Sequence, residues 1–184
     1  MIRKKYFLTL VICFISCIGF SQTKYITKTG EVSFEASVPS FEEVKASNNS
    51  VTAIINTDSG EFAALVLIKG FRFKNALMEE HFNENYAESD QFPKATFKGK
   101  ITDFNLGNIT TNTSFKANGE LTFHGKTKQL KDIVFNISKG ENEISITGNF
   151  NTLASDFDIK IPKIVSNKIA EDIEVSFQFD LKKK

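Results

Sequence analysis

The sequence predicts an all-β domain in which about eight antiparallel strands close into a barrel, with one short helix. Apolar and polar residues alternate along most segments after residue 22, as they do in strands that bury only one face. Helical spacing occurs in one segment, and the connections are short and polar. A sheet with one apolar face buries that face by closing on itself. Two packed sheets would also bury it, so a sandwich is the alternative fold.

The expected strands account for most of the chain after residue 22. They are residues 25–37, 51–56, 61–68, 96–104, 113–124, 132–138, 143–151 and 173–181. Thr29 and Gly30 divide the first strand into two extended pieces. Residues 58–60 have the composition of a hairpin turn between the second and third strands. Pro39 and the polar run 45–50 indicate a connection before the second strand.

The segment 113–124 shows the alternation over the greatest length. Its apolar face carries Phe115, Ala117, Gly119, Leu121 and Phe123. A polar turn is expected over residues 124–128, where Gly125 permits a positive φ angle. We therefore expect Leu121 and Phe123 to point into the barrel and His124 to point out of it.

Residues 75–89 are the one segment with the period of a helix. Its apolar stripe consists of Leu77, Met78, Phe82 and Tyr86, with His81 on the same side. Asn75 is the expected N-cap. Between the last two strands, residues 153–172 are too apolar for a free loop. We expect this segment to cover an end or flank of the sheet, with a helical turn at residues 169–172.

Residues 1–21 have the three parts of an export signal. Arg3, Lys4 and Lys5 precede an apolar run over residues 6–18, and small residues at 19 and 21 predict cleavage before Gln22. The run of about 13 apolar residues is shorter than the roughly 20 that span a bilayer, so no integral membrane span is expected. The domain, residues 22–184, would be exported to the periplasm. A lipoprotein anchor at Cys17 is the less favoured alternative.

Composition argues against several classes of function. Both cysteines, Cys13 and Cys17, lie in the expected signal, so the domain would have no thiol chemistry. Without the three basic residues of the signal, 20 basic residues stand against 22 acidic ones, and a net charge of −2 disfavours nucleic acid as a partner. The two histidines have no ligand spacing around them, and no nucleophile motif is present. We expect no metal, no cofactor and no catalysis.

Two motifs resemble the YceI-like family of exported bacterial proteins. Residues 92–97, FPKATF, are similar to its P-x-A-x-F strand, and residues 119–128, GELTFHGKTK, are similar to its G-x-L-x-x-H-G-x-T-K motif. The abundance of Asn and Phe resembles members from the Bacteroidetes group. This resemblance implies a lipocalin-like barrel whose lumen binds an amphiphilic chain, often a polyisoprenoid, such as a quinone-like lipid.

The candidate ligand-binding residues are the apolar ones expected inside the barrel and on the helix. They are Leu77, Met78, Phe82, Phe97, Ile101, Phe115, Leu121, Phe123, Phe135, Phe150, Val175, Phe177 and Phe179. His81, His124 and Lys126 are candidates for contact with a polar head group at the mouth. Structural roles are the favoured interpretation for the histidines, packing for His81 and the turn for His124, and head-group contact is the alternative.

The phenylalanines leave a second function open. Sixteen of the 19 lie after residue 21, and their rings could fill a small barrel completely. The protein would then act through its outer surface or rim, as an interaction or stress-response module that docks an envelope protein. Pairing of exposed sheet surfaces into a homodimer also stays open.

Overall fold

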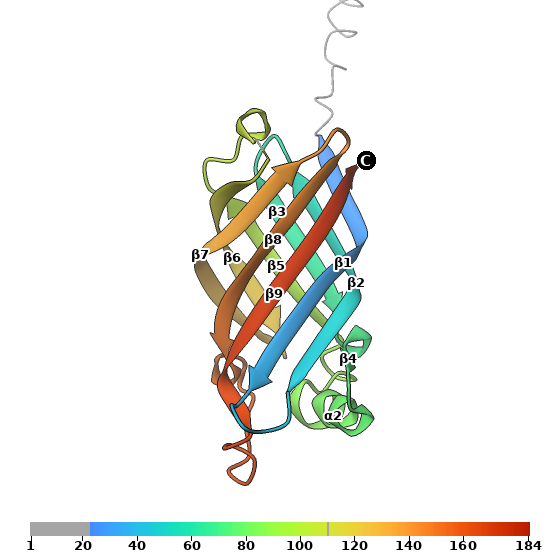
Figure 1. The fold of residues 1–184 in the computed structure, drawn as a ribbon, viewed down its shortest axis with the longest axis vertical. Helices are drawn as coiled ribbons and strands as arrows, with labels where there is room; N and C mark the ends of the chain where they lie inside the picture. The colour runs from blue at the N-terminus through green and yellow to red at the C-terminus, as the bar shows by residue number, and fades with distance from the viewer. Residues whose placement is uncertain (1–22, 110) are drawn as a thin grey trace, which may run out of the picture.

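The computed structural model describes residues 23–109 and 111–184, and the expected signal at residues 1–21 lies outside them. Within these residues, eight long antiparallel strands close into a barrel, which confirms the predicted fold class and excludes the sandwich (Figure 1). The strands are β1 (Lys24–Ser37), β2 (Lys45–Asn56), β3 (Glu61–Leu67), β5 (Lys94–Ile101), β6 (Thr113–Phe123), β7 (Lys126–Lys139), β8 (Glu143–Leu153) and β9 (Ile169–Lys183).

The sheet closes because its first strand pairs on both sides. The order is β1-β9-β8-β7-β6-β5-β3-β2, and β1 also pairs with β2. A short strand, β4 (Arg72–Phe73), extends the sheet beside the start of β2. The register of β1 shifts on either side of Gly30, as expected from the break at this position. A Cβ at Gly30 would lie 2.4 Å from the ring of Phe179, so glycine lets that ring approach the bulged backbone.

The expectation that residues 45–50 form a connection is wrong. They are the first half of β2 and pair with β1, from Glu35 opposite Lys45 to Val32 opposite Asn48. Asn48 is buried, and its side-chain amide donates to the Leu67 carbonyl oxygen at 2.9 Å. Asn48 can occupy an inward position because its side chain is satisfied by hydrogen bonds, so no hydrophobic alternation marks this part of the strand.

The β6–β7 turn is tighter than expected. It consists of His124 and Gly125 alone, with φ angles of 47° and 71°, and residues 126–128 already belong to β7. Positive φ at both central residues is the geometry of a two-residue hairpin turn whose twist matches that of the strands. The polar residues 126–128 therefore belong to the end of a strand and not to a loop.

Helix α2 (Ala76–His81) and the helical turns next to the cavity lie at one end of the barrel, whereas the 3₁₀ turn η3 (Leu106–Asn108) lies at the other end. Helix α2 begins at the predicted N-cap, where Asn75 Oδ1 accepts from the Leu77 N–H at 2.9 Å. It continues as a π-helical turn, η2 (Phe82–Tyr86). A 3₁₀ turn, η4 (Ala154–Phe157), follows β8. The helical turn expected at residues 169–172 is wrong, because these residues begin β9 and pair with β8 and β1.

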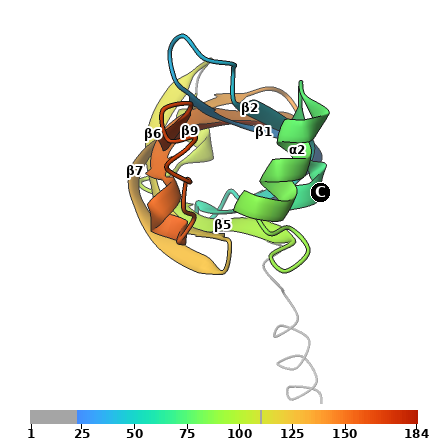
Figure 2. The same cartoon turned by 90° about the horizontal axis from the view of Figure 1, so that it is seen from below.

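The two ends of the barrel are built differently. The end near the start of β1, hereafter the closed end, is filled with fully buried aliphatic side chains, among them Ile55, Ile101, Ile137, Ile144, Ile146 and Leu181. At the opposite end, α2 and the segment after β8 flank the opening (Figures 1 and 2). Across the described residues, no helix combines the length and apolarity needed to cross a bilayer.

Candidate functional site: an apolar cavity at one end of the barrel

A cavity of about 400 Å³ occupies the half of the barrel next to α2 and η4. Its wall includes side chains of β1, β3, β5, β6, β7, β8 and β9, together with α2, η2 and η4. Seen along the barrel, α2 lies on one side of the opening and the segment after β8 lies on the other (Figure 2). This volume is within the range of pockets that hold small ligands.

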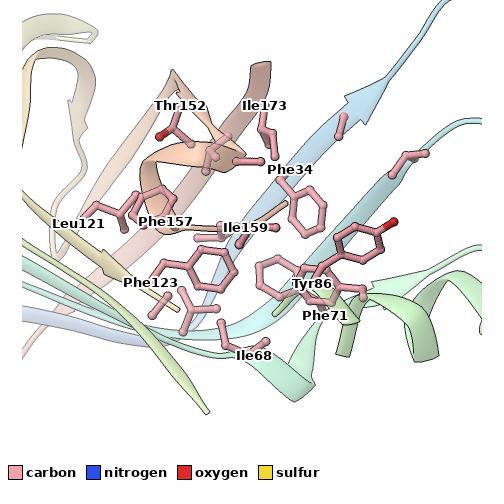
Figure 3. Close-up of a pocket in the computed structure, with 18 of the residues that line it drawn as sticks. Phe34, Ile68, Phe71, Tyr86, Leu121, Phe123, Thr152, Phe157, Ile159 and Ile173 are labelled. Atoms are coloured by element: carbon pink, nitrogen blue, oxygen red, sulfur yellow. The ribbon is translucent and has the colours of Figure 1, made fainter. Parts of the chain in front are cut away.

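The wall of the cavity is made almost entirely of aromatic and aliphatic side chains. Phe34 from β1, Leu121 and Phe123 from β6, and Phe157 and Ile159 from the segment after β8 converge on the same space (Figure 3). These strands place their apolar residues inward by simple alternation. The wall therefore offers apolar contact from every direction.

Aromatic contacts attach the helical segment to the barrel. The ring of Phe82 in η2 lies 5.2 Å from that of Phe34 and 5.3 Å from that of Phe73. Phe34 and Phe71 make an edge-to-face contact at 5.2 Å. Such pairs contribute about 0.5–1.5 kcal/mol each beyond the area they bury. The mouth of the cavity is thus bordered by a packed aromatic group.

A second aromatic group forms the floor of the cavity. It consists of Phe62, Phe97, Phe135, Phe177 and Phe179. The Phe135 and Phe177 rings are 5.0 Å apart, and Phe177 stacks on Phe179 at 5.6 Å. One side of this group faces the cavity and the other joins the aliphatic core of the closed end. The phenylalanines therefore fill only part of the barrel, and the lumen is open in the other part.

Few polar side chains reach the cavity. They are Glu42, His81, Tyr86, Thr96, Thr152 and Lys168. Thr152 is buried, and its hydroxyl donates to the Asp156 carboxylate at 3.2 Å. The Lys128 ammonium also contacts this carboxylate and holds the Asp156 pKa below its usual value. Lys168 has no acidic partner within 4.0 Å in the part of the chain that the structure describes.

Most of the predicted site residues come together in this cavity. Those that line it are Met78, His81, Phe82, Phe97, Leu121, Phe123, Phe135, Phe150, Val175, Phe177 and Phe179. They arrive from seven different elements, so the barrel closure and not their position in the chain assembles them. Met78 of α2 and Phe82 of η2 lie on one face, as the helical spacing predicts, but Leu77 of the predicted stripe does not.

Three apolar candidates lie away from the cavity. Leu77 is on the outer side of α2, and its side chain is 57% exposed. Ile101 is fully buried in the closed end, and Phe115 packs there against Phe104 at 5.7 Å. Alternation identifies the inward face of a strand but not the depth of a residue in the barrel, which explains the misplacement of Ile101 and Phe115.

His124 and Lys126 also lie outside the cavity and hold its framework together. His124 Nε2 lies 2.7 Å from Glu88 Oε2, and Nδ1 lies 2.9 Å from the Phe157 carbonyl oxygen. Lys126 Nζ lies 2.6 Å from Asp158 Oδ2, and this contact lowers the Asp158 pKa. The structural role expected for His124 therefore matches the geometry, whereas His81 lies at the mouth.

Sequence reasoning missed part of the wall. The additional residues include Val32, Phe34, Phe41, Ile68, Phe71, Phe73, Tyr86, Ile159, Ile161, Val165, Ile169 and Ile173. Alternation in residues 32–36 was a usable signal for Phe34. Ile159, Ile161 and Val165 had only the apolar composition of their segment as a signal, because that segment is irregular. That segment does cover an end of the barrel, as expected.

The geometry of this site is that of an apolar binding cavity. Within the described residues, no three His, Cys, Asp or Glu side chains are grouped closely enough to hold a metal ion. The polar groups of the wall are few and separated by apolar surface. The arrangement can bury an apolar molecule and contact a polar group at the mouth.

Comparisons with known proteins agree with this architecture. The model of the YceI-like domain family matches residues 21–181. A solved polyisoprenoid binding domain from Saccharophagus degradans, implicated in plant cell wall breakdown, superimposes with a TM-score of 0.76 at 13% identity, covering 89% of this chain and all of that chain. BcnA from Burkholderia cenocepacia gives 0.69 at 14% identity, with 83% and 95% covered.

A third solved structure, the YceI protein of Campylobacter jejuni, has a TM-score of 0.61 and 18% identity, with 80% of this chain and 89% of that chain covered. At these identities the likeness establishes the fold alone. A search of curated protein sequences found no match.

Proposed function

The chain belongs to the YceI-like domain family, and we propose that it binds an apolar lipid chain, of the polyisoprenoid or quinone-like class, inside the barrel. It would carry or sequester this lipid without chemistry of its own. The observation that supports this function is the open apolar cavity above the phenylalanine floor. Binding would be driven by the transfer of apolar surface out of water, at about 25 cal/mol per Å².

Two features support an isoprenoid or quinone-like ligand in particular. The wall combines rings and branched aliphatic side chains, which suit a branched chain, and Met78 adds an adaptable contact at the mouth. The Saccharophagus degradans domain with the same fold is described as polyisoprenoid binding. His81 and Lys168 lie on the lining and would contact a polar head group.

We also propose that residues 1–21 export the domain to the periplasm. The basic start, the apolar run and the small residues before Gln22 support this localisation. The mass of the protein recovered from a periplasmic fraction tests it. Cleavage before Gln22 leaves residues 22–184. An anchor at Cys17 would instead leave a chain that retains Cys17 in lipid-modified form. An unprocessed chain in the cytoplasmic fraction would contradict export.

Native mass spectrometry followed by organic extraction tests the binding function directly. We expect the protein purified from its own periplasm to carry one hydrophobic molecule, which extraction identifies by class. Delipidated protein should then take up an added isoprenoid alcohol or quinone. An empty protein that also rejects these probes would favour the alternative function, in which the barrel docks a partner through its outer surface.

Two neighbouring alanines of β3 provide a matched test of where the ligand lies. Ala64 faces the cavity opposite Phe97, whereas Ala63 faces outward opposite Lys98. The substitution Ala64→Phe should fill the cavity and reduce lipid retention at least tenfold, and Ala63→Phe should leave retention unchanged. Equal retention in two folded variants would place the ligand outside the barrel.

A further inference from the structure

We propose that the open end of the barrel docks on an anionic lipid bilayer through residues 159–168, hereafter the mouth loop. This loop follows η4 and projects beyond the barrel at the end that carries α2 (Figure 1). The proposal concerns a membrane surface as partner and does not require the cavity to be loaded. A docked mouth would let an apolar chain pass between bilayer and cavity without crossing water.

Exposed apolar side chains gather at the open end. Of the six large hydrophobic residues that are exposed in the described chain, Phe41, Leu67, Leu77, Leu153 and Ile164 lie in elements at this end, and Val134 lies on the barrel side. Ile164, in the mouth loop, is 86% exposed. A single exposed side chain needs no explanation, but several of them at the end of the barrel that holds the cavity mouth mark an interaction surface.

The charge of the mouth loop selects the partner. Residues 159–170, IKIPKIVSNKIA, contain Lys160, Lys163 and Lys168 and no acidic residue. The domain as a whole has a slight acidic excess, so this segment is a basic stretch set between Asp158 and Glu171, and Lys160 is close enough to Asp158 to contribute to the lowering of its pKa. None of the three lysines has an ion-pair partner within 4.0 Å among residues 23–109 and 111–184. Lysines interleaved with exposed isoleucine fit an anionic lipid surface, which attracts the ammonium groups and accepts the apolar tips.

The mouth loop has a defined shape and belongs to the cavity wall. The Val165 N–H donates to the Pro162 carbonyl at 2.9 Å, and the Lys168 N–H donates to the Val165 carbonyl at 2.8 Å. Ile161 and Val165 line the cavity, whereas Ile164 points to solvent. A membrane surface in contact with the mouth loop would therefore also face the mouth of the cavity.

The opposite side of the mouth opposes docking and makes the proposal more specific. Across the opening, α2 and η2 carry several acidic residues (Figure 2). Glu79 is paired with Arg72 at 3.1 Å, but Glu80 and Glu84 have no cationic partner within 4.0 Å in the described chain. An anionic bilayer would repel these two carboxylates. The barrel is therefore expected to dock tilted, with the mouth loop against the membrane and α2 raised.

Co-sedimentation with vesicles tests the docking. We expect the protein to bind vesicles of phosphatidylethanolamine and phosphatidylglycerol, more weakly at high salt, and to stay in solution with phosphatidylcholine vesicles. Equal binding to both kinds of vesicle, or none to either, overturns the proposal. Self-association without vesicles, measured by analytical ultracentrifugation, together with loss of self-association on Ile164→Asp would identify a second copy as the occupant and overturn it as well.

Matched variants locate the binding surface. Neutralising two lysines of the mouth loop, Lys160→Gln with Lys163→Gln, should weaken binding about 25-fold, at roughly fivefold per lysine. The same charge change at the closed end, Lys139→Gln with Lys182→Gln, should have little effect. A similar loss in both pairs would show general electrostatic adsorption and overturn the role of the loop.

The apolar and acidic parts of the surface have their own tests. The substitution Ile164→Asp should weaken binding at least tenfold, whereas Val134→Asp on the barrel side should not. Removing the opposing charges with Glu80→Gln and Glu84→Gln should strengthen binding severalfold, an outcome that a merely structural role of the rim does not give. If none of these variants changes vesicle binding, the proposal is overturned.

The experiments distinguish a failure of docking from a failure of lipid binding. Lys160, Lys163 and Ile164 do not line the cavity, so their variants should retain lipid in solution as the unaltered protein does. A protein that holds lipid but ignores vesicles overturns docking alone. A protein that docks through this loop but never holds lipid contradicts the proposed function and leaves docking supported.

Discussion

Glu88 and His124 meet across 36 residues of sequence, with 2.7 Å between Glu88 Oε2 and His124 Nε2. The second ring nitrogen of His124 lies 2.9 Å from the Phe157 carbonyl oxygen. A carbonyl oxygen only accepts hydrogen bonds, so Nδ1–H donates to Phe157, while Nε2 is in contact with the Glu88 carboxylate. One side chain in a hairpin turn thus joins the segments after η2 and at η4, which border the cavity on two sides.

The substitution His124→Asn tests the contacts of the His124 ring separately from the conformation of the turn. Asparagine accepts the left-handed backbone of the turn, but it is too short to reach both partners. We expect a loss of about 1–3 kcal/mol in the free energy of unfolding, measured in urea, because the Phe157 carbonyl loses its donor and Glu88 loses its contact with the ring. His81→Ala at the exposed rim should change stability by less than about 0.5 kcal/mol. A neutral or stabilising effect of His124→Asn would assign His124 to the turn alone.

Gly125 is required by both the backbone and its surroundings. Its φ angle is +71°, and a Cβ there would lie 2.7 Å from the ring of Phe92. We therefore expect Gly125→Ala to lower the unfolding free energy by at least about 1–2 kcal/mol. Gly140→Ala is the matched control, since a Cβ there meets nothing closer than 3.6 Å. Equal thermal stability of the two variants would contradict this interpretation of the turn.

The Asp156 carboxylate links acid stability to the cavity wall. Its pKa is lowered by the Lys128 ammonium and by the Leu153 N–H, which donates at 2.9 Å. A group with a lowered pKa in the folded state stabilises the fold above its unfolded value, near 3.8, and loses this contribution as pH falls through the folded pKa. The stability difference between the protein and its Asp156→Asn variant should therefore shrink between pH 7 and pH 3.

Urea unfolding at the two pH values measures this difference. The substitution Lys128→Gln removes the same interaction from the other partner, so it should reduce the acid dependence in the same direction. The contribution is modest, because both side chains keep partial contact with water. A difference that grows as the pH falls would have the wrong sign for this ion pair.

The fold was predictable because its signal repeats in every strand. Alternation like that of residues 173–181 identifies a half-buried strand wherever it occurs, and a set of such strands has to close or stack. The failures come from residues whose burial depends on a tertiary partner. Asn48 is inward because the Leu67 carbonyl accepts its hydrogen bond, and no local sequence pattern predicts that partner.

The site was only partly predictable, for a geometric reason. Periodicity fixes the face of a strand on which a residue lies, so Phe97 and Phe115 have the same signal. Their distance along the barrel axis decides that Phe97 borders the cavity while Phe115 lies outside it. That distance depends on the register of all eight strands, and on the irregular mouth loop that covers the opening.

The phenylalanine floor should set the length of chain that the cavity accepts. Phe177 packs on Phe135 at 5.0 Å and lies between the cavity and the closed end. Shortening it to leucine or alanine should deepen the cavity and shift the preference toward longer isoprenoid alcohols in a competition series. The Phe177→Ala variant should also lose about 3–5 kcal/mol of stability, so Phe177→Leu provides a milder test.

The control for this prediction is a phenylalanine of the closed end. Phe115→Ala removes a ring of the same size that does not border the cavity, so it should destabilise the protein and leave the chain-length preference unchanged. If both substitutions shift the preference alike, general loosening of the barrel is the cause. If neither shifts it, the chain is bound nearer the mouth and Phe177 serves the core. A shift confined to Phe177 would mean that core packing and ligand selection share one side chain.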